Sequence, residues 1–443
     1  MGVIMRLVII GGGVAGSEAA LAARKYDRTA EIYLIQKQNY PQYSPCGLPY
    51  ALANDITNFN DLIIFPKEFY EKQGIKILLG TEVKEIMPSD NYILLENNEK
   101  IEYDSLILST GSYSTKLNID GIDKKGVFFI KNLDETKELS EYINESKKAI
   151  VIGFGIIALE GAYALKKRGL DVTIIARKPR PMRQSLDADM GEIVIEYLKQ
   201  KGINLILGKE ISKIEGDEKA KGIIVDNTFY PLDIIVIATG VNSNTSLAVE
   251  SGIEVNGGII TNNNLQTSVK NIYACGDCAS VTDFFTGKLI PSNLGTNAVR
   301  QGKVAGINSV GGDLKFDPVI NATITEVFDL KIGAFGFTED QLIEKGIEYA
   351  KAKYKGKSKA EYYPGAKDIF VKLLSNLEGK IIGVQIIGEE GVFARTLAMA
   401  FAVQKGMTIE ELSKSENCYC PPVSPTIDPL QICAELLLKR LKK

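Results

Sequence analysis

The residues from Arg6 to Lys25 read RLVIIGGGVAGSEAALAARK, a short apolar run followed by glycines and an alanine-rich helical stretch. Gly11, Gly13 and Gly16 form the pattern G-x-G-x-x-G between a predicted strand and a predicted helix. The first glycine permits a tight turn, the second lets the backbone approach a pyrophosphate, and the third lets helix pack on strand. We therefore predict a βαβ unit that binds a dinucleotide at the helix N-terminus.

The second strand of this unit is predicted in AEIYLIQK (30–37), and it ends at Gln36. A ribose-binding carboxylate is expected at that position. An amide still hydrogen-bonds a ribose hydroxyl, although less strongly than a carboxylate. A glycine-rich turn that binds nothing is the alternative interpretation, and the strand–turn–helix context disfavours it.

A second motif of the same kind lies about 140 residues later, in KAIVIGFGIIALEGAYALKKRGLDVTIIAR (148–177). Gly153, Gly155 and Ala158 give G-x-G-x-x-A between a predicted strand and helix. The following strand ends at Arg177, and Arg183 comes shortly after it. An acid there selects NADH, whereas arginine accommodates a 2′-phosphate. We predict preference for NADPH, or tolerance of both nucleotides, with a solvated basic loop as the alternative.

Two dinucleotide units in one chain indicate a flavin and a nicotinamide cofactor. Two further apolar strands, DSLILSTGS and DIIVIATGV, end in Thr-Gly at Gly111 and Gly240, as parallel strands beneath a nucleotide do. A third, NIYACGDCAS, places Gly276 and Asp277 after a strand, where a carboxylate binds the ribityl hydroxyls of a flavin. The C-x-x-C of this stretch has no second pair at zinc spacing, so we interpret its cysteines as structural.

Composition excludes several other functions. The chain has 443 residues, 45% of them hydrophobic, and a formal net charge of −3, so no basic field indicates nucleic acid or an anionic membrane. No apolar run is long enough to span a bilayer, and no secretory signal is visible. Six cysteines in a chain of this length do not form a secreted disulfide framework, which favours a cytoplasmic location. Histidine is absent, and no metal site is predicted.

One cysteine, Cys46, lies in the segment YSPCGLPY (43–50), ahead of a predicted helix start at Gly47. Proline is suited to a first helical turn. A helix N-terminus lowers the pKa of a thiol, and the thiolate is the nucleophile. No other cysteine follows before Cys275, so an internal dithiol at this segment is excluded.

Together these motifs resemble the flavin-dependent pyridine nucleotide–disulfide oxidoreductases. The resemblance is closest to the single-cysteine branch, which contains coenzyme A-disulfide reductases, NADH oxidases and peroxidases, and NAD(P)H polysulfide reductases. It covers nearly the whole chain and rests on GGGVAG, CGLPY, GFGIIALEGA, both Thr-Gly strands, YACGDCA and YCPPVSPTIDP. It implies FAD, with NADPH or NADH as hydride donor and a possible role for coenzyme A. Glu160, inside GFGIIALEGA, is counted with the cofactor-binding residues.

The resemblance also implies how Cys46 works. It places the thiol beside the flavin, where it cycles with an external sulfur or oxygen and forms a mixed disulfide, a persulfide or a sulfenic acid. Relatives without an active-site histidine use tyrosines from the partner subunit. Tyr419 matches one of them, and Tyr362 or Tyr363 in EYYPG matches the other. Pro45 stands where coenzyme A-disulfide reductases often carry asparagine, so the substrate thiol stays open.

The predicted fold class is α/β, with two Rossmann-like dinucleotide-binding domains and a C-terminal α+β dimerisation domain. Residues 1–118 and 248–321 form a discontinuous FAD-binding domain, and residues 119–247 form the NAD(P)H-binding domain. From residue 322 to 443, alternating apolar and polar residues with a turn at NLEGK predict an antiparallel sheet followed by helices. This domain is expected to form a homodimer with a shared active site.

The sequence leaves three candidate functions. The first is reduction of a low-molecular-weight disulfide, with coenzyme A disulfide favoured, or of a polysulfide. The second is an NAD(P)H oxidase that reduces dioxygen at the flavin. The third, from another class, is a non-catalytic flavoprotein that senses redox state or binds a partner.

Overall fold

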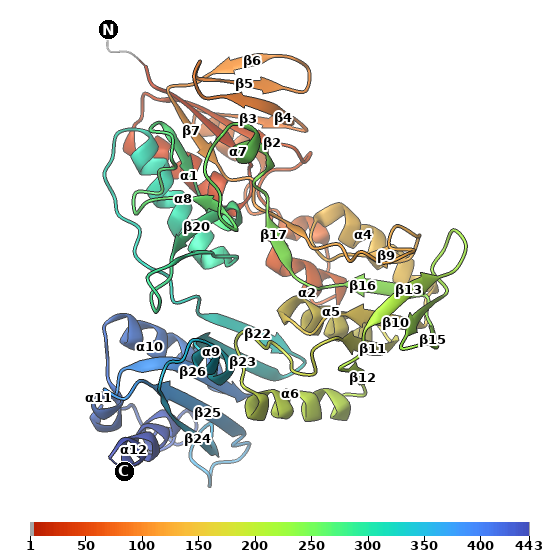
Figure 1. Ribbon diagram of the computed structural model, residues 1–443, viewed down its shortest axis with the longest axis vertical. Helices are drawn as coiled ribbons and strands as arrows, with labels where there is room; N and C mark the ends of the chain where they lie inside the picture. The colour runs from red at the N-terminus through yellow and green to blue at the C-terminus, as the bar shows by residue number, and fades with distance from the viewer. Residues whose placement is uncertain (1–3, 443) are drawn as a thin grey trace.

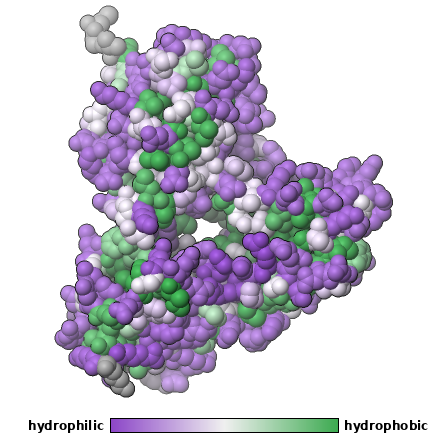
Figure 2. All heavy atoms as spheres, in the orientation of Figure 1, coloured by the Kyte–Doolittle hydropathy of each residue, from purple (hydrophilic) through white to green (hydrophobic). Residues whose placement is uncertain are grey.

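The computed structural model describes residues 4–442; residues 1–3 and 443, which the predicted domain boundaries include, lie outside the described part. The chain forms three lobes (Figure 1). The lobe with the N-terminus also contains a later part of the chain, the second lies beside it, and the last third of the chain forms the third. The space-filling view shows an opening where the three lobes meet (Figure 2).

The first lobe is built on a five-stranded parallel sheet in the order β19-β7-β1-β2-β3. Its strands are β1 (Arg6–Ile10), β2 (Glu31–Gln36), β3 (Ile75–Leu79), β7 (Ser105–Leu108) and β19 (Ile272–Ala274). Leu7 and Ile9 pack with the helices α1 (Val14–Tyr26) and α8 (Gly295–Ser309). Val8 and Ile10 pack on the opposite face. Burial on both faces explains the uninterrupted apolar run of β1.

Smaller elements complete this lobe. One antiparallel sheet contains β4 (Val83–Met87), β5 (Tyr92–Leu95) and β6 (Lys100–Glu102), and another small sheet contains β18 (Ile259–Ile260), β20 (Ala279–Thr282) and β21 (Leu289–Pro291). Two short helices are α3 (Lys67–Lys72) and α7 (Ser246–Glu250). Because β19 and α8 return to the sheet of β1, this unit is built from two separated stretches of chain.

The second lobe is also built on a five-stranded parallel sheet, in the order β12-β11-β10-β16-β9. Its strands are β9 (Val127–Phe128), β10 (Lys148–Ile152), β11 (Asp171–Ala176), β12 (Asn204–Leu207) and β16 (Ile234–Ile237). Its helices are α4 (Leu133–Tyr142), α5 (Ile156–Lys167) and α6 (Ala188–Gln200), and a three-stranded antiparallel sheet contains β13 (Ile211–Glu215), β14 (Gly222–Val225) and β15 (Thr228–Pro231).

Two features join these lobes. β8 (Ser112–Ser114) and β17 (Val241–Ser243) pair as an antiparallel ribbon where the chain passes between them. The short helix α2 (Leu48–Leu52) comes from the first lobe but packs against α4 and α5 of the second. The segment that carries Cys46 therefore lies at the junction (Figure 1).

The third lobe is an antiparallel sheet in the order β22-β23-β26-β25-β24. Its strands are β22 (Thr323–Val327), β23 (Leu330–Gly336), β24 (Ala350–Lys357), β25 (Asp368–Ser375) and β26 (Ile381–Gly388), and its helices are α9 (Glu339–Glu344), α10 (Val392–Gln404), α11 (Ile409–Lys414) and α12 (Pro429–Leu441). The predicted fold class is confirmed, while the boundaries at 118, 247 and 321 stay predictions. Among the described helices, none is both long and apolar enough to cross a bilayer.

Candidate active site

The first glycine turn leaves room for a ligand at one position only. A Cβ atom on Gly11 would lie 2.2 Å from the Ser109 carbonyl oxygen, and one on Gly16 would lie 1.9 Å from the Gly11 carbonyl oxygen. Both positions therefore require glycine. A Cβ atom on Gly13 would meet nothing within 4 Å. Gly13 precedes α1, whose N-terminus has no side-chain cap. Free N–H groups and open space at one helix end suit a pyrophosphate.

The second glycine turn repeats this arrangement at the start of α5. A Cβ atom on Gly153 would lie 2.2 Å from the Ala238 carbonyl oxygen, whereas one on Gly155 would meet nothing within 4 Å. Ala158 is fully buried against the sheet. The N-terminus of α5 also lacks a side-chain cap, so this turn offers a second pyrophosphate cradle.

Asp277 sits in a hydrogen-bonded chain between the two lobes. The Lys131 ammonium donates to Ser112 Oγ at 2.7 Å, and this hydroxyl donates to Asp277 Oδ2 at 2.6 Å. The Lys131 Nζ and Asp277 Oδ2 atoms are 3.9 Å apart, and both side chains are about one-quarter exposed. Ser243 Oγ holds the Asp277 carbonyl oxygen at 2.6 Å. The carboxylate is thus fixed in position, with an exposed edge.

Cys46 lies in a 3₁₀ turn (Pro45–Gly47) directly before α2, and its side chain is exposed. Protein atoms nevertheless surround it closely, and this partial burial is the main cause that raises the pKa of the thiol. The carboxylates of Glu160 and Asp277 raise the pKa further, and the Lys131 ammonium opposes them. The start of α2 predicts a lower thiol pKa, and in the protein chain alone burial and these two carboxylates act against that effect.

Two tyrosines from separate loops meet on the third lobe. The hydroxyls of Tyr362 and Tyr419 are 2.8 Å apart, and both side chains are exposed. This hydrogen bond is the main cause that raises the pKa of Tyr362. Tyr363 has no bond to either of them among the described contacts, so Tyr362 is the one that the structure pairs with Tyr419.

Comparison with known families agrees with this geometry. The model of the family described as pyridine nucleotide-disulphide oxidoreductase matches residues 5–302, and the model of that family's dimerisation domain matches residues 323–430. The chain belongs to the pyridine nucleotide-disulphide oxidoreductase family. It is therefore an enzyme, and its family implies FAD and NAD(P)H as cofactors.

Individual relatives place this oxidoreductase within the family. A protein named NADH oxidase from Methanocaldococcus jannaschii is 41% identical and covers 99% of each chain. A CoA-dependent NAD(P)H sulfur oxidoreductase from Pyrococcus furiosus is 34% identical over 98% of this chain and 99% of its own. The solved structure of a NAD-dependent persulfide reductase from A. fulgidus has a TM-score of 0.96 at 32% identity, and covers 99% of this chain and 84% of that chain. The chain is an NAD(P)H-dependent flavin oxidoreductase of the branch that contains coenzyme A-disulfide reductases, NADH oxidases and polysulfide reductases.

Gln36 contacts the glycine turn of this oxidoreductase directly. Its Oε1 atom accepts the Gly12 N–H at 2.9 Å, and its Nε2 atom donates to Gln38 Oε1 at 3.2 Å. The side chain is buried. It therefore stabilises the turn that would hold the pyrophosphate, and its contact with a ribose stays a prediction. The Thr-Gly residues Gly111 and Gly240 both have positive φ and open space beside them.

Gly276 is fixed next to Asp277 by α8. Its N–H donates to Gln301 Oε1 at 2.7 Å, and the Nε2 atom of this fully buried glutamine has no partner in the described protein. Buried amide nitrogens are rarely left unpaired. A donor without a partner beside Asp277 therefore fits a bound group with acceptor atoms, such as the flavin dinucleotide that the family implies.

Three arginines follow β11, and the structure separates them. Arg177 is 73% exposed, with a 3.6 Å ion pair to Glu210, and Arg183 is exposed without a partner for its guanidinium among the described residues. Arg180 is mostly buried and pairs with Asp340 of α9 at 2.5 Å. Arg177 and Arg183 are therefore accessible to a 2′-phosphate, whereas Arg180 is already neutralised.

Glu160 lies on α5, where all three lobes meet. Thr325 Oγ1 of β22 donates to its Oε1 atom at 2.7 Å, and the Tyr50 hydroxyl of α2 lies 3.5 Å away. Burial raises the pKa of Glu160, although both of these contacts oppose the shift. No ion pair neutralises this carboxyl group within residues 4–442.

The other cysteines differ from Cys46 in exposure. Cys275, Cys278 and Cys433 are buried, and burial raises the pKa of each, which makes these thiols unreactive. Cys418 and Cys420 are exposed on either side of Tyr419. None of the six is in a disulfide.

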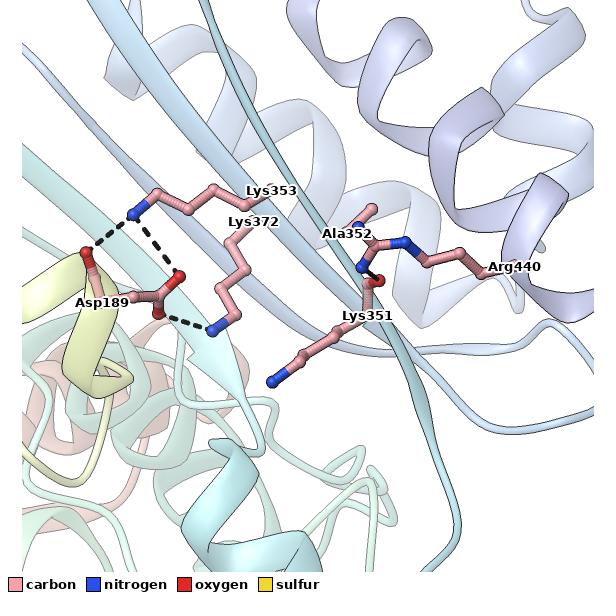
Figure 3. Close-up of a pocket in the computed structure, with 6 residues that line it drawn as sticks. All are labelled: Asp189, Lys351, Ala352, Lys353, Lys372 and Arg440. Atoms are coloured by element: carbon pink, nitrogen blue, oxygen red, sulfur yellow. Dashed lines mark hydrogen bonds and ion pairs between the residues drawn. The ribbon is translucent and has the colours of Figure 1, made fainter.

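Three carboxylates gather away from this site, at Asp187, Asp189 and Glu339. The buried Lys372 ammonium lies 2.9, 2.6 and 2.5 Å from their oxygens, in the order given. Figure 3 shows this lysine directed at Asp189, beside a cavity of about 210 Å³. Because the ammonium occupies the position that a cation would take, the cluster is a charge network and gives no support to a metal site.

Sequence reasoning missed Lys131, Ser112, Tyr50 and Thr325. Tyr50 stood inside the quoted CGLPY segment and lies four residues after Cys46, which was an available signal. Ser112 directly follows Gly111 at the end of the quoted DSLILSTGS strand, which was also an available signal. Lys131 and Thr325 come from segments without a motif, and only the meeting of the lobes brings them to the site.

Proposed function

We propose that this chain is an FAD-dependent NAD(P)H oxidoreductase that reduces a low-molecular-weight disulfide, with coenzyme A disulfide favoured, or a polysulfide, through Cys46. The observation that carries the proposal is an accessible thiol at the junction of the lobes, with no second cysteine near it in the sequence. A thiol without an internal partner must react with an external sulfur or oxygen, and exchange with an external sulfur is the reaction proposed here.

The residues present fit the two cofactors that the family implies. The first glycine turn, Gln301 and Asp277 would hold FAD, and the second turn with Arg177 and Arg183 would hold NAD(P)H. Bound FAD would supply two-electron chemistry between the nicotinamide and sulfur. Metal ions have no part in this proposal.

The thiolate of Cys46 attacks one sulfur of a disulfide RSSR. The S–S bond breaks, a mixed disulfide Cys46–S–SR forms, and RS⁻ leaves with the electron pair of the broken bond. Two electrons that originate from NAD(P)H then cleave the mixed disulfide, which restores the Cys46 thiolate and releases the second R group as a thiolate. Each RS⁻ takes a proton, and a tyrosine hydroxyl is a suitable donor.

The tyrosine pair would act on the Cys46 site of a partner subunit. The dimerisation domain carries an unpartnered stripe on α10, where Phe393, Leu397 and Phe401 are 59, 40 and 61% exposed. Their spacing of four residues puts them on one helix face. An apolar stripe of this kind supports a homodimer with a shared active site.

The CoA-dependent sulfur oxidoreductase named above supports coenzyme A as the thiol, although Pro45 replaces the asparagine expected beside the cysteine. The relative named NADH oxidase favours the second candidate, reduction of dioxygen at the flavin. The two activities are compatible in one protein. The non-catalytic flavoprotein is set aside, since the family is enzymatic.

Mass spectrometry of the intact, unreduced holoenzyme tests the thiol class. We expect a coenzyme A adduct that maps to Cys46 and is removed by reductant. A persulfide on Cys46 would favour polysulfide as the substrate. An unmodified thiol or a sulfenic acid, combined with fast dioxygen consumption, would contradict the disulfide proposal and support the oxidase.

The variant Cys46→Ser is predicted to lose disulfide reductase activity by at least about 100-fold, because the nucleophile is removed. Flavin content should stay at the wild-type level, since the glycine turns and Asp277 are unchanged. Dioxygen consumption should persist. The control Cys418→Ser should keep disulfide turnover, and retained turnover in Cys46→Ser would refute the mechanism.

A further inference from the structure

One loop of the second lobe connects the second glycine turn to the third lobe. The loop covers residues 177–187, between β11 and α6. Its Met182 N–H donates to the Phe154 carbonyl oxygen at 2.7 Å. Phe154 is the residue between Gly153 and Gly155, so this hydrogen bond holds the backbone of the turn itself. The loop is therefore in direct contact with the cradle proposed for the second pyrophosphate.

Met182 makes this hydrogen bond from a backbone conformation that few side chains adopt. Its φ is +45°, in the left-handed region, and its side chain is buried, as is that of Phe154. Its carbonyl oxygen accepts the N–H groups of Ser185 at 2.7 Å and of Leu186 at 2.9 Å. A residue other than glycine keeps a positive φ only where its surroundings enforce it. The packing of the loop thus enforces the conformation that directs the Met182 N–H to Phe154.

Helix α9 of the third lobe contacts this loop on both sides of Met182. On the N-terminal side, the Arg180 guanidinium pairs with Asp340 at 2.5 Å. On the C-terminal side, the side-chain amide of Gln341 donates to Gln184 Oε1 at 3.1 Å. Asp340 and Gln341 are consecutive residues of α9, so one short helix holds the loop before and after the strained residue.

The end of the loop is buried against the third lobe. Asp187 is 2% exposed, and its N–H donates to Gln385 Oε1 of β26 at 2.9 Å. The Gln385 Nε2 atom donates back to Asp187 Oδ2 at 2.8 Å, and the Glu339 N–H donates to Asp187 Oδ1 at 2.7 Å. Hydrogen bonds and ion pairs therefore connect the third lobe to the loop, and the loop to the glycine turn.

We propose that Met182 is a positioning residue for NAD(P)H, and that Asp340 and Gln341 of the dimerisation domain act through it. The Met182 N–H fixes the Phe154 peptide, which directly precedes the uncapped N-terminus of α5. That N-terminus would bind the pyrophosphate, which NADH and NADPH share. A change in these contacts should therefore weaken both nucleotides by the same factor. The proposal rests on the proposed binding of NAD(P)H at this turn, and it does not depend on the sulfur substrate.

The test is anaerobic stopped-flow reduction of the flavin in the holoenzyme, with no disulfide present. The dependence of the rate on nucleotide concentration gives an apparent Kd and a limiting rate for NADH and for NADPH. Met182→Ile and Met182→Leu introduce isomeric side chains, but a β-branched side chain tolerates a positive φ least. We expect Met182→Ile to raise both apparent Kd values by about 3- to 10-fold, with limiting rates within about twofold of wild type. The conservative variant Met182→Leu should keep the wild-type Kd values.

A second variant tests the contact from the third lobe. Asp340 is 66% exposed, so Asp340→Asn tests the proposal even if Met182→Ile does not fold. We expect it to raise both apparent Kd values by about 2- to 5-fold. The matched control is Asp329→Asn, which breaks another ion pair between the same two lobes, with Lys201 at 3.0 Å, and should change neither value.

The two nucleotides separate positioning from direct binding. A change for NADPH alone in Asp340→Asn would show that Arg180 acts on the 2′-phosphate, and it would overturn the proposal. Unchanged Kd values in Asp340→Asn, or equal effects of Met182→Ile and Met182→Leu, would also overturn it. If both Kd values rise as expected but the wild-type enzyme reduces no disulfide, the proposed function fails and this inference stands.

Discussion

Arg177 and Arg183 are the accessible cations at the end of β11, where the second nucleotide's ribose is expected. The pair of Arg177 with Glu210 is exposed on both sides and contributes little, so a 2′-phosphate can displace it. Arg180 instead forms an ion pair with Asp340 of α9. Single residues thus determine which charges remain available to the nucleotide.

The double variant Arg177→Ala/Arg183→Ala is predicted to raise the KM for NADPH by about 10- to 100-fold, with a much smaller change for NADH. The physical reason is the loss of charge-assisted hydrogen bonds that only the 2′-phosphate can make. Steady-state kinetics with both nucleotides measure the two KM values. The control is Lys209→Ala, which removes an exposed lysine of the same lobe. A wild-type enzyme at least about tenfold better with NADH would contradict the prediction.

At the scale of elements, one buried arginine ties together the two loops that carry the tyrosine pair. Arg395 of α10 is 7% exposed and pairs with Asp428, the N-cap of α12, at 2.7 Å. It also donates to the Ser358 carbonyl oxygen, at the start of the loop that carries Tyr362. Tyr419 precedes α12 on the other loop. Arg395 therefore contacts the start of both loops whose tyrosine hydroxyls lie 2.8 Å apart.

Tyr419→Phe is predicted to slow disulfide reduction by about 100- to 10,000-fold if the hydroxyl is the general acid. Reduction of the flavin by NADPH should stay near wild type, because the tyrosine pair lies on the dimerisation domain. Stopped-flow absorbance separates the two half-reactions. Tyr362→Phe should give a smaller loss, and Tyr363→Phe is the matched control.

The same variant tests whether the site is shared. Heterodimers that combine Cys46→Ser subunits with Tyr419→Phe subunits should contain one intact site each and recover part of the activity. Recovery requires that α10 forms the expected interface. Heterodimers that form but stay inactive would show that Tyr419 serves its own subunit or has no catalytic part.

At the scale of the whole molecule, Lys372 joins the second and third lobes. It comes from β25, is 2% exposed, and pairs with Asp187 and Asp189 at the start of α6 and with Glu339 of α9. Lys353 also reaches Asp189, beside the cavity (Figure 3). Burial opposes the charge of Lys372, but its three carboxylates raise its pKa well above the ordinary value. The network fixes the loop of Arg177 and Arg183 to the dimerisation domain.

Lys372→Met is predicted to destabilise the protein by about 3–5 kcal/mol, because it leaves buried carboxylates without a counter-charge. Denaturant unfolding measures this, and Lys367→Met, which breaks an exposed pair, should cost less than about 1 kcal/mol. If Lys372→Met lowers the free energy of unfolding no more than Lys367→Met does, the network does not hold the lobes together.

The network also gives a pH dependence. Burial opposes ionisation of Glu339, but hydrogen bonds from Lys351 and Lys372 outweigh it and lower the pKa of this carboxyl from 4.5 to about 2. A depressed folded-state pKa stabilises the protein above the unfolded value of 4.5, and this contribution is lost as pH falls toward 2. The stability difference between wild type and Glu339→Gln should therefore shrink between pH 7 and pH 3.

The sequence by itself determined the nucleotide-binding turns, the types of sheet and the reactive cysteine. Glycine spacing predicted both nucleotide turns, because a Cβ atom at position 11 or 153 would lie 2.2 Å from a neighbouring carbonyl oxygen and only glycine lacks one. Apolar runs and alternation predicted the parallel and antiparallel sheets. Cys46 was found from its motif, since its chemistry depends on residue type and neighbours in the chain.

Tertiary structure decided the environment of the thiol and the choice between tyrosines. The pKa of Cys46 depends on Glu160, Asp277 and Lys131, which lie 85 to 231 residues away in the chain. Tyr362 and Tyr363 are equivalent in the sequence, and only the approach of a second loop separates them. Electrostatic and hydrogen-bonding interactions act over distance in space, so sequence patterns that report local periodicity do not contain them.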